Sequence, residues 1–229
     1  MLVYTVPALL VSLTRIGFDA IVEILPMFSK REALRFGWNT FKAHWLFLLV
    51  VVLLANFISF APGFFLQWLS EDFFWVKWMV NIVFWVLGAV FTIGQFRVLL
   101  LFLAGKKPEY SDLFRESKLV VSYWIGSFLY GLLVFAGFLL FIIPGFIVLT
   151  RLQFWTYVMV NKQCGPIAAL KESWHITRGS VINIMLFNLL TVAVVFLGVL
   201  AFGVGVFVAI PVTLLATTFV YGKLQTPQV

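Results

Sequence analysis

Six stretches of mostly apolar sequence, separated by short basic segments, most constrain what this chain can fold into. They cover about residues 45–67, 78–103, 122–143, 145–160, 180–200 and 203–221. A helix that crosses a bilayer needs about 20 mainly apolar residues, so a chain of 229 residues has room for six such spans in one domain. Because 63% of the residues are hydrophobic and only 11% are charged, the composition argues against a water-soluble fold.

The distribution of basic residues predicts how the spans are oriented. Twelve of the sixteen Lys and Arg side chains lie between residue 29 and the first stretch, or after the second, fourth or sixth. Among Lys and Arg residues, only Lys77 lies in the links on the opposite side. Because cytoplasmic loops are enriched in Lys and Arg, both termini are predicted to lie in the cytoplasm. The net charge of +7 is therefore explained by basic residues that orient the spans and contact anionic lipid headgroups. No nucleic-acid partner is expected.

The first 28 residues are apolar but interrupted by charged side chains. Arg15, Asp19 and Glu23 are spaced four residues apart and would form one charged ladder on a helix. We expect residues 1–28 to lie in the membrane interface as an amphipathic helix. The alternative is a seventh span, which would move only the N-terminus to the other side of the membrane.

A short pattern recurs before three pairs of apolar stretches. Residues 33–38 match residues 169–174, and residues 113–117 are a weaker third copy. Apolar side chains repeat at helical spacing, so each copy is predicted to be an interfacial amphipathic helix. The expected fold class is all-α, a polytopic membrane helix bundle of six transmembrane helices, arranged as three hairpins that each follow such a helix. Its predicted limits are 29–223 for the transmembrane domain, about 29–105, 109–162 and 165–223 for the repeats, and 224–229 for a short cytoplasmic tail.

Local signals mark the last of these amphipathic segments. Pro166 is suited to start a helix there and Gly179 to end it. Trp38 in the first copy and Trp174 in the third are the expected interfacial anchors, because indole is favoured at headgroup depth.

Several short motifs of the chain resemble a bacterial membrane family. They are residues 142–146, Arg151, residues 169–174, residues 177–179, residues 33–42 and residues 111–114. The family comprises the YciC-like integral membrane proteins and the membrane domain attached to some glycerophosphoryl diester phosphodiesterases. The resemblance covers roughly residues 30–223 and implies a polytopic protein of the bacterial inner membrane without an assigned activity. Because the soluble phosphodiesterase domain has no counterpart in this sequence, the resemblance implies no hydrolase activity.

Two arginines lie within the predicted spans, where a charge is costly and faces a partner or water. Arg97 is some six residues from the cytoplasmic end of its span, and Arg151 is nearer mid-depth. Our functional hypothesis is a site for an anion or a lipid phosphate at the inner leaflet; the alternative is that both arginines cap carbonyl groups or pair with polar neighbours. No acidic partner is evident in the spans, and Glu116 is interpreted as a surface charge or helix cap. The candidate lipid-binding or anion-binding residues are Arg97, Arg151, Arg35, Lys42 and Arg178.

The polar and small residues of the spans are interpreted first as packing features. The amides are expected to form hydrogen bonds between helices, with a polar translocation path as the alternative. Small residues at every fourth position of the last span let helix backbones approach closely, within the bundle or, as the alternative, in a dimer. The amides are Asn56, Asn81, Gln95, Gln153, Asn183 and Asn188, and the small residues are Ala201, Gly205, Ala209, Thr213 and Thr217.

No pattern in the sequence indicates catalysis. Cys164, His44 and His175 lack the neighbours that a nucleophile, a metal site or an acid–base pair requires, so we expect no enzyme activity, metal or cofactor. The favoured function is a non-enzymatic inner-membrane protein of scaffold or envelope-homeostasis type that binds anionic lipids, with a homo-oligomer left open. The first alternative is a small transporter or channel for a lipid, amphiphile or anion that uses Arg97 and Arg151. The second is a lipid-modifying membrane enzyme.

Overall fold

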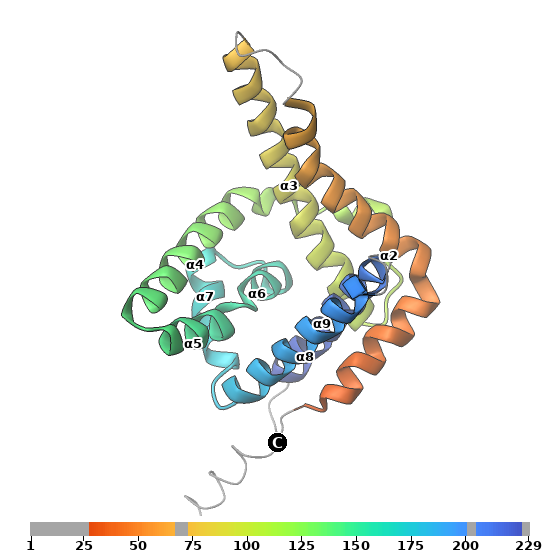
Figure 1. Ribbon diagram of the computed structural model, residues 1–229, viewed down its shortest axis with the longest axis vertical. Coiled ribbons are helices and arrows are strands. Elements are labelled where there is room, and N and C mark those ends of the chain that lie inside the picture. The colour runs from red at the N-terminus through yellow and green to blue at the C-terminus, as the bar shows by residue number, and fades with distance from the viewer. Residues whose placement is uncertain (1–27, 67–72, 201–204, 226–229) are drawn as a thin grey trace, which may run out of the picture.

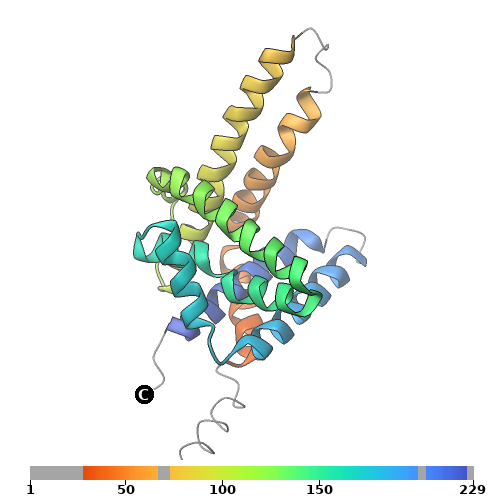
Figure 2. The ribbon, with the colours of Figure 1, turned by 90° about the vertical axis from the view of Figure 1, so that its left-hand side faces the viewer.

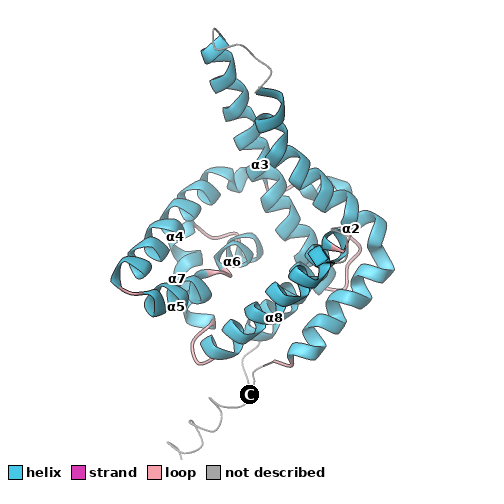
Figure 3. Cartoon of the chain, viewed as in Figure 1, coloured by secondary structure: helices cyan, strands magenta, loops and turns pink. Residues whose placement is uncertain are grey.

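The computed structural model describes residues 28–66, 73–200 and 205–225, and this part of the chain consists of helices joined by short loops, without strands (Figure 3). In chain order the elements are α2 (Lys30–Leu66), α3 (Phe74–Leu103), the 3-10 turns η2 (Tyr110–Leu113) and η3 (Ser117–Leu119), α4 (Val120–Leu140), α5 (Ile142–Leu152), α6 (Trp155–Lys162), α7 (Pro166–Ile176), α8 (Val181–Leu200) and α9 (Val206–Gln225). Residues 1–27 lie outside the described residues. The choice between an interfacial helix and a seventh span therefore stays a prediction.

Six helical stretches of the described chain are long and apolar enough to cross a membrane. They are Lys30–Ala55, Phe74–Leu103, Tyr110–Leu140, Ile142–Lys162, Val181–Leu200 and Val206–Gln225. Each stretch reaches the roughly 20 residues that a hydrocarbon core requires. The protein is therefore a multi-pass membrane protein with an all-α bundle, as the sequence predicts.

Helix α2 bends at His44, whose φ of −134° and ψ of 31° are non-helical. The bend falls where the sequence predicts the change from the first amphipathic segment to the first span. Before it, Ala33 and Phe41 are buried while Arg35 and Lys42 are exposed. The segment thus has one packed face and one basic face.

The middle copy takes a form that the sequence did not predict. Residues 110–119 make two 3-10 turns rather than one amphipathic α-helix. One reason is the close approach of the segment to α3, because a Cβ at Gly94 would overlap the carbonyl group of Leu113. A second reason is local: the backbone N–H of Glu109 donates to the Asp112 carboxylate over 2.9 Å, which caps the first turn.

The fourth predicted span, residues 145–160, is interrupted rather than continuous. Helix α5 ends at Leu152 and α6 begins at Trp155, with Gln153 and Phe154 between them. Every residue from 155 to 160 is buried, so α6 lies at the centre of the molecule, where Figure 1 shows it nearly end-on. Its Tyr157 ring packs 4.6 Å from the Phe96 ring of α3. This interruption places polar groups of the chain inside the bundle.

Close backbone contacts join the outer helices. The largest interface is between α2 and α9, where a Cβ at Gly37 would overlap the carbonyl oxygen of Val212. In Figure 2 the α2–α3 hairpin extends away from the other helices, and the side chain of Trp75 near its end is 79% exposed. Such exposed apolar surface is stable where acyl chains, rather than water, are the solvent.

Candidate functional site

Arg151 lies in the last turn of α5, directly before the interruption of the fourth span. A helix that ends leaves carbonyl groups without backbone donors, and these need other partners in a membrane. The Ser173 hydroxyl donates to the Arg151 carbonyl over 2.8 Å. The Thr177 hydroxyl lies 3.3 Å from the same carbonyl oxygen and shares its proton with the Ser173 carbonyl, which is 2.9 Å away. Ser173 belongs to α7 and Thr177 is the residue that follows its last turn, and both are buried. The end of α5 is thereby fixed against α7.

The guanidinium group of Arg151 stacks on an aromatic ring of α7. Its Cζ lies 4.4 Å from the centroid of the Trp174 ring, the arrangement of a cation–π contact. No carboxylate of the described residues pairs with Arg151, and its Nε is buried without a hydrogen-bond partner. The positive charge is thus held in place but not neutralised.

A mostly apolar groove of about 350 Å³ lies beside this contact. Helices α4, α5 and α7 form it, and Trp174 belongs both to the groove and to the stack with Arg151. Lys171, which is exposed, contributes a second cation to the lining. The remaining lining residues are Leu133, Val148, Leu152 and Leu170.

Helix α7 presents these side chains because its ends are well defined. Pro166 occupies the first turn, where its missing N–H is not needed. Gly179, which follows the helix, has a φ of +81° that glycine adopts without strain. Both ends lie where the sequence predicts them.

Arg97 differs from Arg151 because it has an acidic partner. Its Nη1 lies 3.6 Å from Oε1 of Glu116, and their side chains are 30% and 7% exposed. The side-chain amide of Gln163 donates to the second carboxylate oxygen over 2.8 Å. The interpretation of Glu116 as a surface charge or cap was wrong, because the 110–119 segment folds back along α3 and buries it. The sequence does contain a signal for this pair. Only a short segment separates the end of α3 from Glu116, so the chain can fold back and bring the carboxylate to Arg97.

The other predicted cations lie on exposed surfaces. Arg35 and Lys42 are exposed on α2, and Arg178 is exposed just after α7. The Nζ of Lys42 lies 4.9 Å from the centroid of the Trp38 ring. The side chains of Trp38 and Trp174 are 44% and 41% exposed, as suits an interface. No contact among the described residues joins Arg97 to Arg151.

The polar amides of the spans do not line one path. The Asn188 amide donates to Gln153 over 3.0 Å, whereas the Asn81 amide donates to the Lys77 carbonyl in its own helix over 2.9 Å. The side chain of Asn56 lies outside the described residues. A bond within one helix and one interhelical pair thus account for Asn81, Asn188 and the side-chain oxygen of Gln153.

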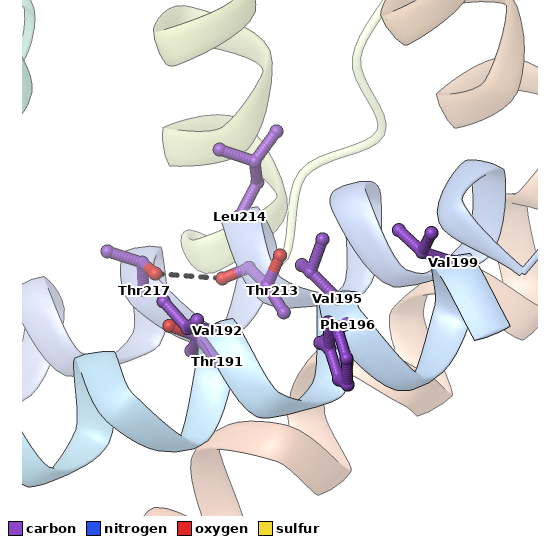
Figure 4. A pocket seen from close by; sticks show the side chains of 8 residues that line it. All are labelled: Thr191, Val192, Val195, Phe196, Val199, Thr213, Leu214 and Thr217. Carbon is purple, nitrogen blue, oxygen red and sulfur yellow. Dashed lines mark hydrogen bonds between the residues drawn. The ribbon is translucent and has the colours of Figure 1, made fainter. Parts of the chain in front are cut away.

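The small-residue stripe of α9 faces α8. A Cβ at Gly205 would lie 2.7 Å from the carbonyl oxygen of Gly198, so the two backbones are in close contact. Further along, a cavity of about 420 Å³ opens between these helices (Figure 4). Thr213 and Thr217 line it, but their hydroxyls donate to carbonyls of α9. Ala209 is buried, and Ala201 lies outside the described residues.

No metal site is apparent, since no three His, Cys, Asp or Glu side chains of the described chain could hold an ion together. Comparison of the chain with models of protein families, with curated proteins and with solved structures finds no match. The contact of α5 with α7 combines a cation–π pair with a groove, and it is the candidate functional site.

Proposed function

We propose that this chain is a non-enzymatic inner-membrane protein of scaffold or envelope-homeostasis type that binds anionic lipid headgroups on its basic side. The observation that carries the proposal is Arg151, a cation held on Trp174 without a carboxylate partner. A phosphate group is the natural counter-ion for a guanidinium group at a membrane surface. The resemblance to YciC-like proteins and the cytoplasmic placement of both termini are parts of the same proposal.

The basic side explains why several cations would act together. Arg35, Lys42 and Arg178 are exposed and would lie near the headgroups if their segments share one face. Each Lys or Arg near an anionic leaflet contributes about 1 kcal/mol of attraction. Together with Arg151, these three charges are enough to retain anionic lipid around the protein.

Lipid retention by the purified full-length protein tests this proposal. Native mass spectrometry would compare phosphatidylglycerol with phosphatidylcholine of the same acyl chains. We expect preferential retention of phosphatidylglycerol, a reduction when Arg35, Lys42, Arg178 and Arg151 are changed together to Gln, and no reduction for Lys77→Gln as the control. Equal retention of the two lipids by the wild-type protein would contradict the proposal.

The interruption between α5 and α6 favours a transporter as the second candidate. Transporters often place their sites at broken helices. The Nε2 of Gln153 in this interruption is buried without a hydrogen-bond partner. The four described cavities, however, are lined mainly by apolar side chains, and neither Arg97 nor Arg151 lines them. Movement of fluorescent phosphatidylglycerol across reconstituted vesicles, lost in Gln153→Leu, would favour transport over the scaffold.

A further inference from the structure

We propose that the groove between α4, α5 and α7 is a defined site for one acidic glycerophospholipid, whose phosphate lies against Lys171, attracted also by the charge that Arg151 holds on Trp174, and whose acyl chain occupies the groove. This inference rests on the proposed lipid-binding function and narrows it from a basic surface to a single site. It adds Lys171 and Trp174 to the residues that bind the lipid.

The groove has the shape and lining that an acyl chain requires. Its volume of about 350 Å³ is at the low end of the range for small-molecule sites, which suits one chain better than a whole lipid. Leu133 and Val148 come from two membrane-crossing stretches, whereas Leu170 comes from α7. The groove therefore joins the hydrocarbon-facing helices to the segment that carries the basic residues.

The charges at the groove favour an anion. Lys171 is exposed and lines the groove, and no contact of the described residues neutralises it. The neighbouring carboxylate of Glu172 already accepts a hydrogen bond from Lys162 over 2.8 Å. Arg151 adds a second positive charge behind the Trp174 ring. An uncharged headgroup would leave these two cations without a counter-ion, and a zwitterionic headgroup would bring a cation of its own beside its phosphate.

The site is also rigid, which distinguishes it from a flexible basic tail. Ser173 and Thr177 hold α7 on the Arg151 carbonyl. Trp174 stands on the same helix, between the guanidinium group and the groove. Because these positions are set before a lipid arrives, the side chains lose little conformational entropy on binding.

Three single variants of the full-length protein test the site. Lys171→Gln removes the exposed cation, and Leu133→Trp fills the groove without a change of charge at a position that is 45% exposed. Arg178→Gln is the matched control, since it removes an exposed charge beside the same helix. Retention of phosphatidylglycerol is measured by native mass spectrometry. Circular dichroism and size-exclusion chromatography verify that each variant is folded.

We expect Lys171→Gln and Leu133→Trp each to weaken retention of phosphatidylglycerol by about tenfold, and Arg178→Gln by less than about twofold. Glycerol 1-phosphate, which has the phosphate but no acyl chain, should not displace the lipid. Displacement by it would show a phosphate site without a chain and would overturn the inference.

The remaining outcomes separate this inference from the broader proposal. If Lys171→Gln and Arg178→Gln reduce retention equally while Leu133→Trp has no effect, binding is a diffuse property of the basic surface. The defined site then fails and the proposed function stands. If the wild-type protein retains phosphatidylcholine as well as phosphatidylglycerol, both fail. Lys171 is exposed, so its variant remains informative even if Leu133→Trp does not fold.

Discussion

Arg97 and Arg151 are similar in sequence context and different in the folded chain. Both lie within apolar stretches that are predicted to cross the membrane. In the structure, Arg97 pairs with the buried carboxylate of Glu116, whereas Arg151 stacks on Trp174 and keeps its charge. The difference arises from the segments that pack beside each arginine. A folded-back loop brings a carboxylate to Arg97, and α7 brings hydroxyls and an indole ring to Arg151.

This comparison separates a structural charge from one that is available to a ligand. An arginine that is paired inside the bundle holds three elements together: α3, the 110–119 segment and the end of α6. An arginine without a carboxylate partner is free to attract an anion. The variants below therefore affect stability on the Arg97 side and chiefly lipid binding on the Arg151 side.

Loss of the Glu116 carboxylate should have the largest effect on stability. Glu116→Gln leaves Arg97 charged and unpaired inside the bundle, and we expect the free energy of unfolding to fall by about 3 kcal/mol. Unfolding by sodium dodecyl sulfate in mixed micelles measures the change. Glu172→Gln, at a pair with more exposed side chains, is the control and should cost less than about 0.5 kcal/mol. Equal effects of the two variants would remove the distinction between the two arginines.

A methyl group at Gly94 should disrupt the packing of the segment that carries Glu116, the partner of Arg97, against α3. Gly94→Ala forces the backbone at Leu113 away from α3, together with the segment that carries Glu116. We expect a loss of about 2 kcal/mol in the same unfolding assay. Gly131→Ala is the control, because no atom lies within 4 Å of the added Cβ and alanine favours a helix. A stable Gly94→Ala variant would contradict the close packing of this segment.

The hydroxyls on the Arg151 side should matter less for stability. Ser173→Ala removes one donor to the Arg151 carbonyl, but Thr177 still donates to it, so we expect a loss of about 1 kcal/mol. The double variant with Thr177→Ala should lose more than the sum of the two single variants, because the buried carbonyl then has neither hydroxyl donor. Additive losses would show that the two hydroxyls act independently.

The reactivity of Cys164 should report how firmly the end of α6 is held. Burial raises the pKa of the Cys164 thiol, so less thiolate is present at pH 8 than in an ordinary cysteine. We expect N-ethylmaleimide to react roughly fivefold slower at pH 8 with the folded chain than with the unfolded chain, and faster as the pH rises through the raised pKa.

The same reaction compares the two arginine sites. Gln163, next to Cys164, donates to Glu116, so Glu116→Gln should speed alkylation about threefold at pH 8, as more of the thiol becomes solvated. Ser173→Ala should leave the rate unchanged. If Ser173→Ala speeds alkylation and Glu116→Gln does not, the end of α6 is held by the contacts of Arg151 rather than by Glu116.

The amino-acid sequence alone was enough to establish that the chain lies in a membrane, that it is helical, and where some of its helices begin or end. Hydrophobic stretches of this length are visible in the sequence, and the start of α7 at Pro166 and the turn at Gly179 depend on local backbone preferences. These properties involve residues that are close together along the chain. For the same reason, the amphipathic first segment could be separated from the span that follows it.

The partners of the charges emerged only from the folded arrangement of the helices. Gln163 and Glu116 are 47 residues apart in the chain, and Thr177 and Arg151 are 26 apart. The hydropathy of each stretch contains no information on such pairs, since it does not specify which helices pack together. The central position of α6 and the groove beside α7 depend on the same long-range packing, in which close backbone contacts and buried polar groups outweigh local preference.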